Sequence, residues 1–155
     1  MGRINWQRLF LGGLFAGFVD NLLQFVVNRL YLFRLSDSAI GMRGMAKTER
    51  TDNHFPLFMM ILVGGIFCVW LYAMIRPRFG SGPMTATLAG CVYWLLSWLF
   101  PNVLNRLSGL SPAIPMWLLA THLITHLGVT VAATIVGSWF YREFDAQEAR
   151  VLQEV

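Results

Sequence analysis

Two histidines one helical turn apart, His122 and His126, have the side chains in this sequence best suited to chemistry. They lie in the stretch from Trp117 to Tyr141, WLLATHLITHLGVTVAATIVGSWFY, which is apolar and long enough to cross a bilayer. Residues four apart lie on one face of a helix, so the two imidazoles and Thr125 are predicted to share a face. Ionisable groups at membrane depth are costly, so this face should point into a bundle.

An intramembrane imidazole pair is compatible with two kinds of chemistry. Neutral imidazole is a common axial ligand, so His122 or His126 could ligate a haem or a chlorophyll-type pigment. Ligation across a bundle favours a histidine on each of two helices, but the third histidine, His54, falls in a hydrophilic segment. Alternatively, the pair could take part in a proton path, because intramembrane ionisable residues mark such paths.

The first apolar stretch carries a matching set of polar residues. A stripe of small and polar residues recurs there at steps of three or four, which places them on one helix face; its members are Gly13, Gly17, Asp20, Gln24, Asn28 and Tyr31. If the first and last spans are antiparallel, Asp20 and His126 both lie near mid-depth. Contacts between Asp20 and His126, and between Gln24 and His122, are therefore predicted. A purely structural role, in which these groups satisfy one another and set helix register, is an equally direct interpretation.

Four spans account for most of the chain, and they predict an all-α, up-down-up-down membrane four-helix bundle forming one domain over residues 1–155. The spans are expected at about residues 8–33, 57–76, 84–100 and 113–141, with an extramembrane loop at 34–55 and a charged tail at 142–155. Pro77 is expected to end the second span, Pro101 to end or kink the third, and Ser111-Pro112 to begin the fourth. Small residues predicted to allow close helix packing are Gly13, Gly17, Ala86, Gly90 and Gly128.

Composition excludes several classes of protein. The chain is 56% hydrophobic and 13% charged, far more apolar than a soluble domain. Cys68 and Cys91 lie inside apolar runs without metal-ligand spacing, so neither a disulfide framework nor a metal site is predicted. The net charge of +4 comes from basic residues scattered at the ends of apolar runs, where they meet lipid headgroups rather than nucleic acid. No catalytic set is recognisable, so an enzyme is not expected.

Short motifs add a resemblance. The opening INWQRLFLGGLFAG, the segment WLYAMIRPRFGSGPMTATLAG and the ending VGSWFYRE together resemble a set of uncharacterised small bacterial four-span membrane proteins. The resemblance implies four helices, a bacterial cytoplasmic membrane location and a polar position in the middle of the first span, here Asp20 and Asn21. It implies no activity and no catalytic residue.

These observations lead to three functional hypotheses. The first is a non-enzymatic subunit that contacts lipid and packs against other integral membrane subunits of a larger complex. The second is a haem- or chlorophyll-binding protein that uses His122 or His126, and the third is a small transporter or proton-conducting bundle. Basic residues divide evenly between the two membrane sides, but those on the side of the termini adjoin the spans, which favours cytoplasmic termini.

Overall fold

The computed structural model describes residues 4–32, 54–109 and 115–141, and this part of the chain is helical throughout its length apart from short connections. Four of its helical stretches are long and apolar enough to cross a membrane. Along the chain these are α1 (Trp6–Val27) with the π-helical turn η1 (Asn28–Leu32), then α3 (Phe55–Phe79), then α4 (Pro83–Trp94) continuing through the π-helix η2 (Leu95–Leu99) into α5 (Phe100–Leu107), and last α6 (Met116–Phe140). The predicted integral membrane four-helix bundle is confirmed.

The helix boundaries differ from the predicted ones for local reasons. Helix α1 begins at Trp6 because the Asn5 side-chain oxygen accepts the Arg8 backbone N–H at 3.2 Å, a standard N-cap. Helix α3 runs through Pro77 to Phe79 and closes with the Gly80 N–H donating to the Arg76 carbonyl at 2.8 Å. Helix α6 begins at Met116 after the non-helical cap Pro115, not at residue 113. The predicted start at Ser111-Pro112, the tail and most of the 34–55 loop lie outside the described residues.

Pro101 does not end the third span, which is one of the two outcomes predicted from the sequence. The helix widens into η2 just before it, so that the Phe100 N–H donates to the Leu95 carbonyl, five residues back. A proline inside a regular α-helix removes one hydrogen bond and clashes with the carbonyl four residues earlier. A π-helical turn is one of the recognised adjustments at such a point, and it lets the span continue to Leu107.

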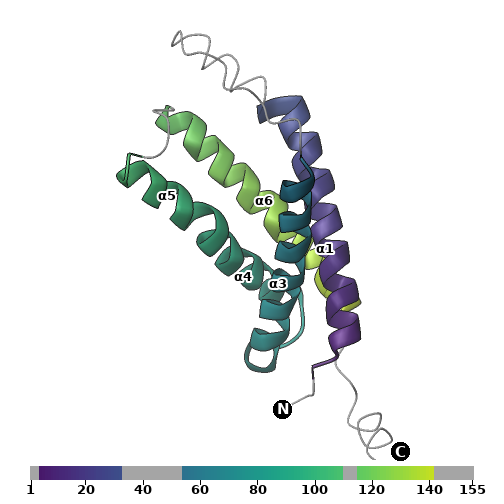
Figure 1. Cartoon of the computed structure of the whole chain (residues 1–155). Coiled ribbons are helices and arrows are strands. Elements are labelled where there is room, and N and C mark those ends of the chain that lie inside the picture. Colours follow the sequence, from purple (N-terminus) through teal and green to yellow (C-terminus); the bar gives the residue numbers. More distant parts are fainter. Residues whose placement is uncertain (1–3, 33–53, 110–114, 142–155) are drawn as a thin grey trace, which may run out of the picture.

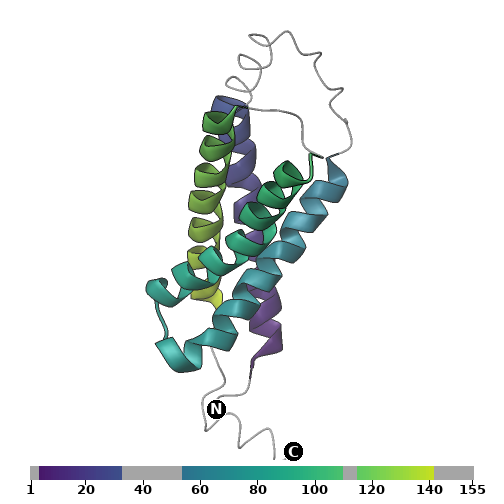
Figure 2. The same ribbon diagram turned by 90° about the vertical axis from the view of Figure 1, so that its left-hand side faces the viewer.

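The helices pack in a ring, with α1 against α3 and α6, and α4 against α3 and α6 (Figures 1 and 2). Glycines set the closest approach: a Cβ added at Gly13 would lie 2.5 Å from the Ile66 Cα, and one at Gly17 would lie 2.6 Å from the Leu62 Cα. Positions rising along α1 thus meet positions falling along α3, so these two helices are antiparallel. Small residues let membrane helices approach at this distance.

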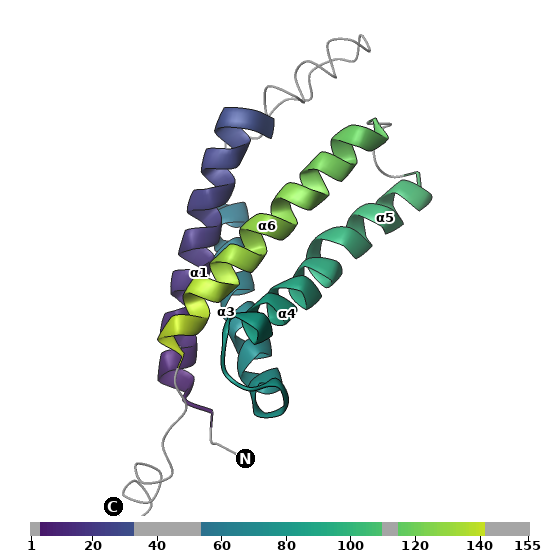
Figure 3. The same ribbon diagram turned by 180° about the vertical axis from the view of Figure 1, so that it is seen from behind.

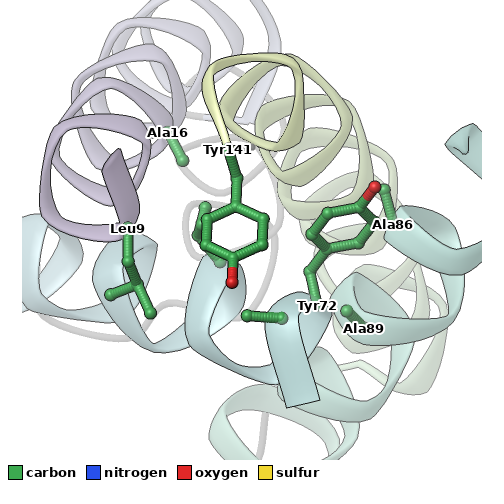
Figure 4. Close-up of a cluster of buried hydrophobic side chains, with 8 residues drawn as sticks. Leu9, Ala16, Tyr72, Ala86, Ala89 and Tyr141 are labelled. Atoms are coloured by element: carbon green, nitrogen blue, oxygen red, sulfur yellow. The ribbon is translucent and has the colours of Figure 1, made fainter. Parts of the chain in front are cut away.

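A compact apolar cluster fills the end of the bundle where α1 begins and α6 ends (Figure 4). Its buried members are Leu9, Ala16, Val69, Tyr72, Ala73, Ala86, Ala89 and Tyr141. The Tyr141 ring meets Tyr72 edge-on with centroids 6.1 Å apart, and the Arg76 guanidinium lies 5.7 Å from the Tyr141 ring centroid. Such contacts add to the apolar burial. Away from this end, α6 and α5 diverge from α1 and α3 (Figures 1 and 3).

Candidate functional site: a polar bundle interior

The inward faces of α1 and α6 form two stripes that oppose each other. On α1 the stripe is Gly12, Ala16, Asp20 and Gln24, and on α6 it is Gly137, Ala133, Thr130 and His126; all eight residues are buried inside the bundle. At the small end a Cβ added at Gly137 would lie 2.5 Å from the Ala16 Cβ and 2.8 Å from the Gly12 carbonyl oxygen. Beyond this contact both stripes become polar, in the region where the two helices diverge (Figure 3).

Asp20 lies in the interior, with 6% of its surface exposed. Its Oδ1 accepts a hydrogen bond from the Gln24 amide at 2.9 Å, one turn along the same helix. The carboxyl group is also close enough to interact electrostatically with the Cys68 thiol and the Tyr93 hydroxyl. Ionisable groups from α1, α3 and α4 therefore share the bundle interior, as expected of ionisable residues inside a membrane.

His126 is buried but does not bond to Asp20, so the predicted contact is wrong. Instead its ring stacks on Trp98, with centroids 3.7 Å apart and planes 14° apart, and the His122 ring lies 6.3 Å away. Its Nδ1 atom is buried without a hydrogen-bond partner among the described residues. The reason is geometric: α1 and α6 diverge, and η2 brings an indole from the third span against the imidazole. The Gln24 amide, predicted to contact His122, donates to Asp20.

Several groups that line this interior were missed by the sequence analysis. The Cys68 thiol lies beside the Thr134 side chain, and the Thr134 hydroxyl donates to the Thr130 carbonyl at 2.7 Å. The Trp94 indole N–H donates to the Leu123 carbonyl at 3.0 Å, which fixes the third span against α6. One signal was available, because His122, His126, Thr130, Thr134 and Ser138 follow one another at steps of four. No comparable pattern marks Cys68 on α3.

The remaining predicted residues have simpler positions. The Thr125 hydroxyl donates to the Thr121 carbonyl at 2.7 Å within its own helix, and Asn28 is half-buried where η1 begins. Ala86 is fully buried, and Gly90 packs on α6, where an added Cβ would lie 3.1 Å from the Val131 Cα. Gly128 is exposed and an added Cβ would meet nothing within 4 Å, so its predicted packing role is wrong within this chain.

The site therefore offers hydrogen-bonding and protonatable groups inside a membrane bundle. Groups of three or more histidine, cysteine or acidic side chains suited to a metal ion are not found in the described ranges. No protein-family model, curated protein or solved structure matches the chain.

Proposed function

We propose that this protein is a non-enzymatic membrane subunit that packs against a larger membrane protein complex through its third span. The observation that supports this role is a mismatch between how apolar each span is and how much of it is covered. The third span, Pro83–Leu107, has the lowest mean hydropathy of the four. Yet only 11% of its 18-residue apolar stretch is buried, against 33%, 39% and 33% for the first, second and fourth spans.

Lipid alone accounts poorly for this mismatch. In a membrane bundle the less apolar surfaces turn toward protein, because lipid offers no hydrogen-bond partners and helix association depends on close packing. The most apolar span, α3, is instead the most covered one. One face of the third span is already used inside the chain, through Ala86, Ala89 and Gly90. The opposite face is exposed and includes Leu88, Val92, Leu95 and Leu96; close packing of a second membrane protein on these side chains would cover the span that this chain covers least.

Site-specific photo-crosslinking in native membranes tests this proposal. A photoreactive residue at Leu96 probes the third span, and one at Phe18 is the matched control, since Phe18 is similarly exposed near the middle of α1. We expect Leu96 to yield a discrete adduct with a different membrane protein, whereas Phe18 yields adducts with lipid only. Lipid adducts alone from both positions, or an adduct with a second copy of this chain, would overturn the proposal.

Pigment or haem ligation gains less support from the geometry. A ligating histidine is normally oriented by a hydrogen bond at its other ring nitrogen. The buried Nδ1 of His126 has no such partner in the described part of the chain, and the Trp98 indole covers one face of the ring. Proton conduction gains more support, because the polar stripe of α6 runs along most of its length.

A further inference from the structure

We propose that the region between Asp20 and Gln24 on α1 and His126 and Thr130 on α6 binds water, which enters from the membrane side opposite the termini, and that Asp20 exchanges its proton through this water. The site is independent of the docking face proposed for the third span.

Two unsatisfied buried groups mark the position. The His126 Nδ1 atom and the Thr130 Oγ1 atom are both buried without hydrogen-bond partners in the described residues, and these side chains are 5% and 1% exposed. They lie one turn apart on the inward face of α6. Leaving a buried donor or acceptor unpaired is costly, and native proteins satisfy such groups with ordered water when no protein group is near. Water between the two side chains can hydrogen-bond to both.

The register of the helices places Thr130 between Asp20 and Gln24 in depth, with His126 one turn farther from the termini. Gly137 meets Ala16, so distances along both helices can be counted from that contact. At a rise of about 1.5 Å per residue, Asp20 lies about 6 Å beyond it, Thr130 about 10 Å and Gln24 about 12 Å. His126 lies about 16 Å beyond it by the same count. Thr130 is therefore level with the space between the two α1 side chains, so the same water can reach the Asp20 carboxyl group.

Access is one-sided. Toward the termini, the Gly12–Gly137 contact and the apolar cluster that contains Tyr72 and Tyr141 close the interior (Figure 4). Toward the other membrane side, α6 and α1 diverge (Figures 1 and 3), and the polar residues that follow the site, Asn28 and His122, are only half-buried. We therefore expect water to reach Thr130 from that side, past the half-buried Asn28 and His122.

The charges around the site make a proton the simplest counterion of Asp20. The titratable groups on the helices around Asp20 are Cys68 from α3, Tyr93 from α4, and His122 and His126 from α6. No arginine or lysine in the described ranges forms an ion pair with Asp20, and a buried carboxylate without a partner is strongly disfavoured. In the exchange, an O–H bond of hydronium breaks and an O–H bond at Asp20 forms, leaving water, so no other reactant is needed.

Infrared spectroscopy of the full-length protein in lipid nanodiscs tests the exchange. We expect a carboxylic acid C=O band that changes with pH, disappears in Asp20→Asn and shifts within the mixing time on transfer to deuterium oxide. In the double variant Thr130→Val/His126→Phe the band should persist, but its deuterium shift should slow by about tenfold or more, as protection from solvent increases. Thr130→Ser retains the hydroxyl group and should exchange like the wild type.

Two results would overturn the exchange. One is a wild-type Asp20 band that is absent at every pH at which the bundle stays folded, or that does not shift in deuterium oxide over hours. The other is equally fast exchange in the double variant, with helical content and elution volume unchanged. The wild-type measurement decides the matter even if the double variant fails to fold.

Cysteine accessibility tests the direction of entry. In a background lacking Cys68 and Cys91, Gln24→Cys and Ala16→Cys place thiols on the same face of α1, on either side of Asp20. We expect a small membrane-impermeant thiol reagent, added on the side opposite the termini, to label Gln24→Cys and leave Ala16→Cys unlabelled. Labelling of Ala16→Cys alone, or of neither thiol in folded protein, would overturn one-sided entry.

Discussion

At the level of single residues, His126 stacks on Trp98 instead of making the predicted contact with Asp20. A carboxylate partner for His126 was expected from α1, but an indole from the third span occupies that position. The consequence is that, within the described part of the chain, the Asp20 side chain receives a hydrogen bond only from Gln24, while the His126 imidazole is held by ring contact.

We therefore predict that His126 and Trp98 are energetically coupled. A double-mutant cycle with His126→Ala and Trp98→Ala should give a coupling of about 0.5–1.5 kcal/mol, the range found for ring pairs. The measurement is reversible unfolding in mixed detergent micelles. A cycle between Trp98→Ala and Thr125→Ala serves as control, since Thr125 bonds within its own helix and should add independently. Additive effects in the first cycle would contradict the stack.

A second prediction concerns two glycines inside helices, Gly65 and Gly128, which differ in the atoms that surround them. An added Cβ at Gly65 would meet the Gly17 nitrogen and Gly13 carbonyl of α1, whereas one at Gly128 would meet nothing. Gly65→Ala should destabilise the fold by about 1–3 kcal/mol or more, because backbone atoms cannot move aside as side chains can. Gly128→Ala should be neutral or stabilise the helix by up to about 1 kcal/mol.

Unfolding in mixed micelles measures both glycine variants. Equal stability of Gly65→Ala and Gly128→Ala would show that α1 and α3 do not touch where the structure places them.

At the level of elements, η2 is the feature that orients the third span. A π-helical turn contains one more residue than an α-helical turn. The residues after it therefore point in the directions that they would have in a regular α-helix from which one residue had been removed. This shift aims Trp98 at His126 while Trp94 donates to the Leu123 carbonyl. The exposed side chains of Leu95 and Leu96 lie in the wide turn.

Deletion variants should therefore behave differently inside and outside η2. Deleting Leu96 should convert η2 to a regular α-helix and leave Trp98 on His126, at a cost of about 3 kcal/mol for Pro101 in a regular helix, so the protein should still fold but with a lowered thermal unfolding temperature. Deleting Leu88, which lies in the regular helix α4, should rotate everything after it by about 100° and abolish folding. Equal damage from both deletions, measured by gel filtration and thermal unfolding in detergent, would contradict this role for η2.

At the level of the whole molecule, the bundle is closed at one end and divergent at the other. Ring contacts such as Phe15 on Phe140, with centroids 4.6 Å apart, hold α1 to α6 near the termini. Toward the other end the helices separate (Figure 1), and the interior becomes polar. A closed apolar end and a polar divergent end give the protein a direction across the membrane.

Distances between pairs of spin labels, measured by pulsed electron paramagnetic resonance in a bilayer, test this shape. Labels at the exposed positions Leu11 and Trp139 report on the closed end, and labels at Leu30 and Ile124 report on the divergent end. We expect the second pair to be farther apart than the first, because α6 tilts away from α1. Equal separations for the two pairs would show that the helices stay side by side along their whole length.

The sequence by itself determined the number of spans, their approximate extent and the residues that turn inward. The length of an apolar stretch identifies a span. Polar groups are costly in lipid, so Asp20, Gln24 and His126 are expected in the bundle interior, regardless of which groups they contact there. The stripe of α1 was therefore readable before any fold was known. The wider turn at η2 was not, because a proline such as Pro101 more often ends or kinks a helix than lengthens its preceding turn.

Only the tertiary structure decided which inward groups meet. Helical spacing gives the face of each residue but not the tilt between two helices, and tilt decides whether Asp20 and His126 touch or stand apart. Gly12 and Gly137 let α1 meet α6 closely at one end, whereas α1 stays beside α3 as far as the hydrogen bond from the Asn21 amide to the Phe58 carbonyl at 3.3 Å. The lone Cys68 and Tyr93 have no pattern of their own, and they join the site because α3 and α4 bring them to the depth of Asp20.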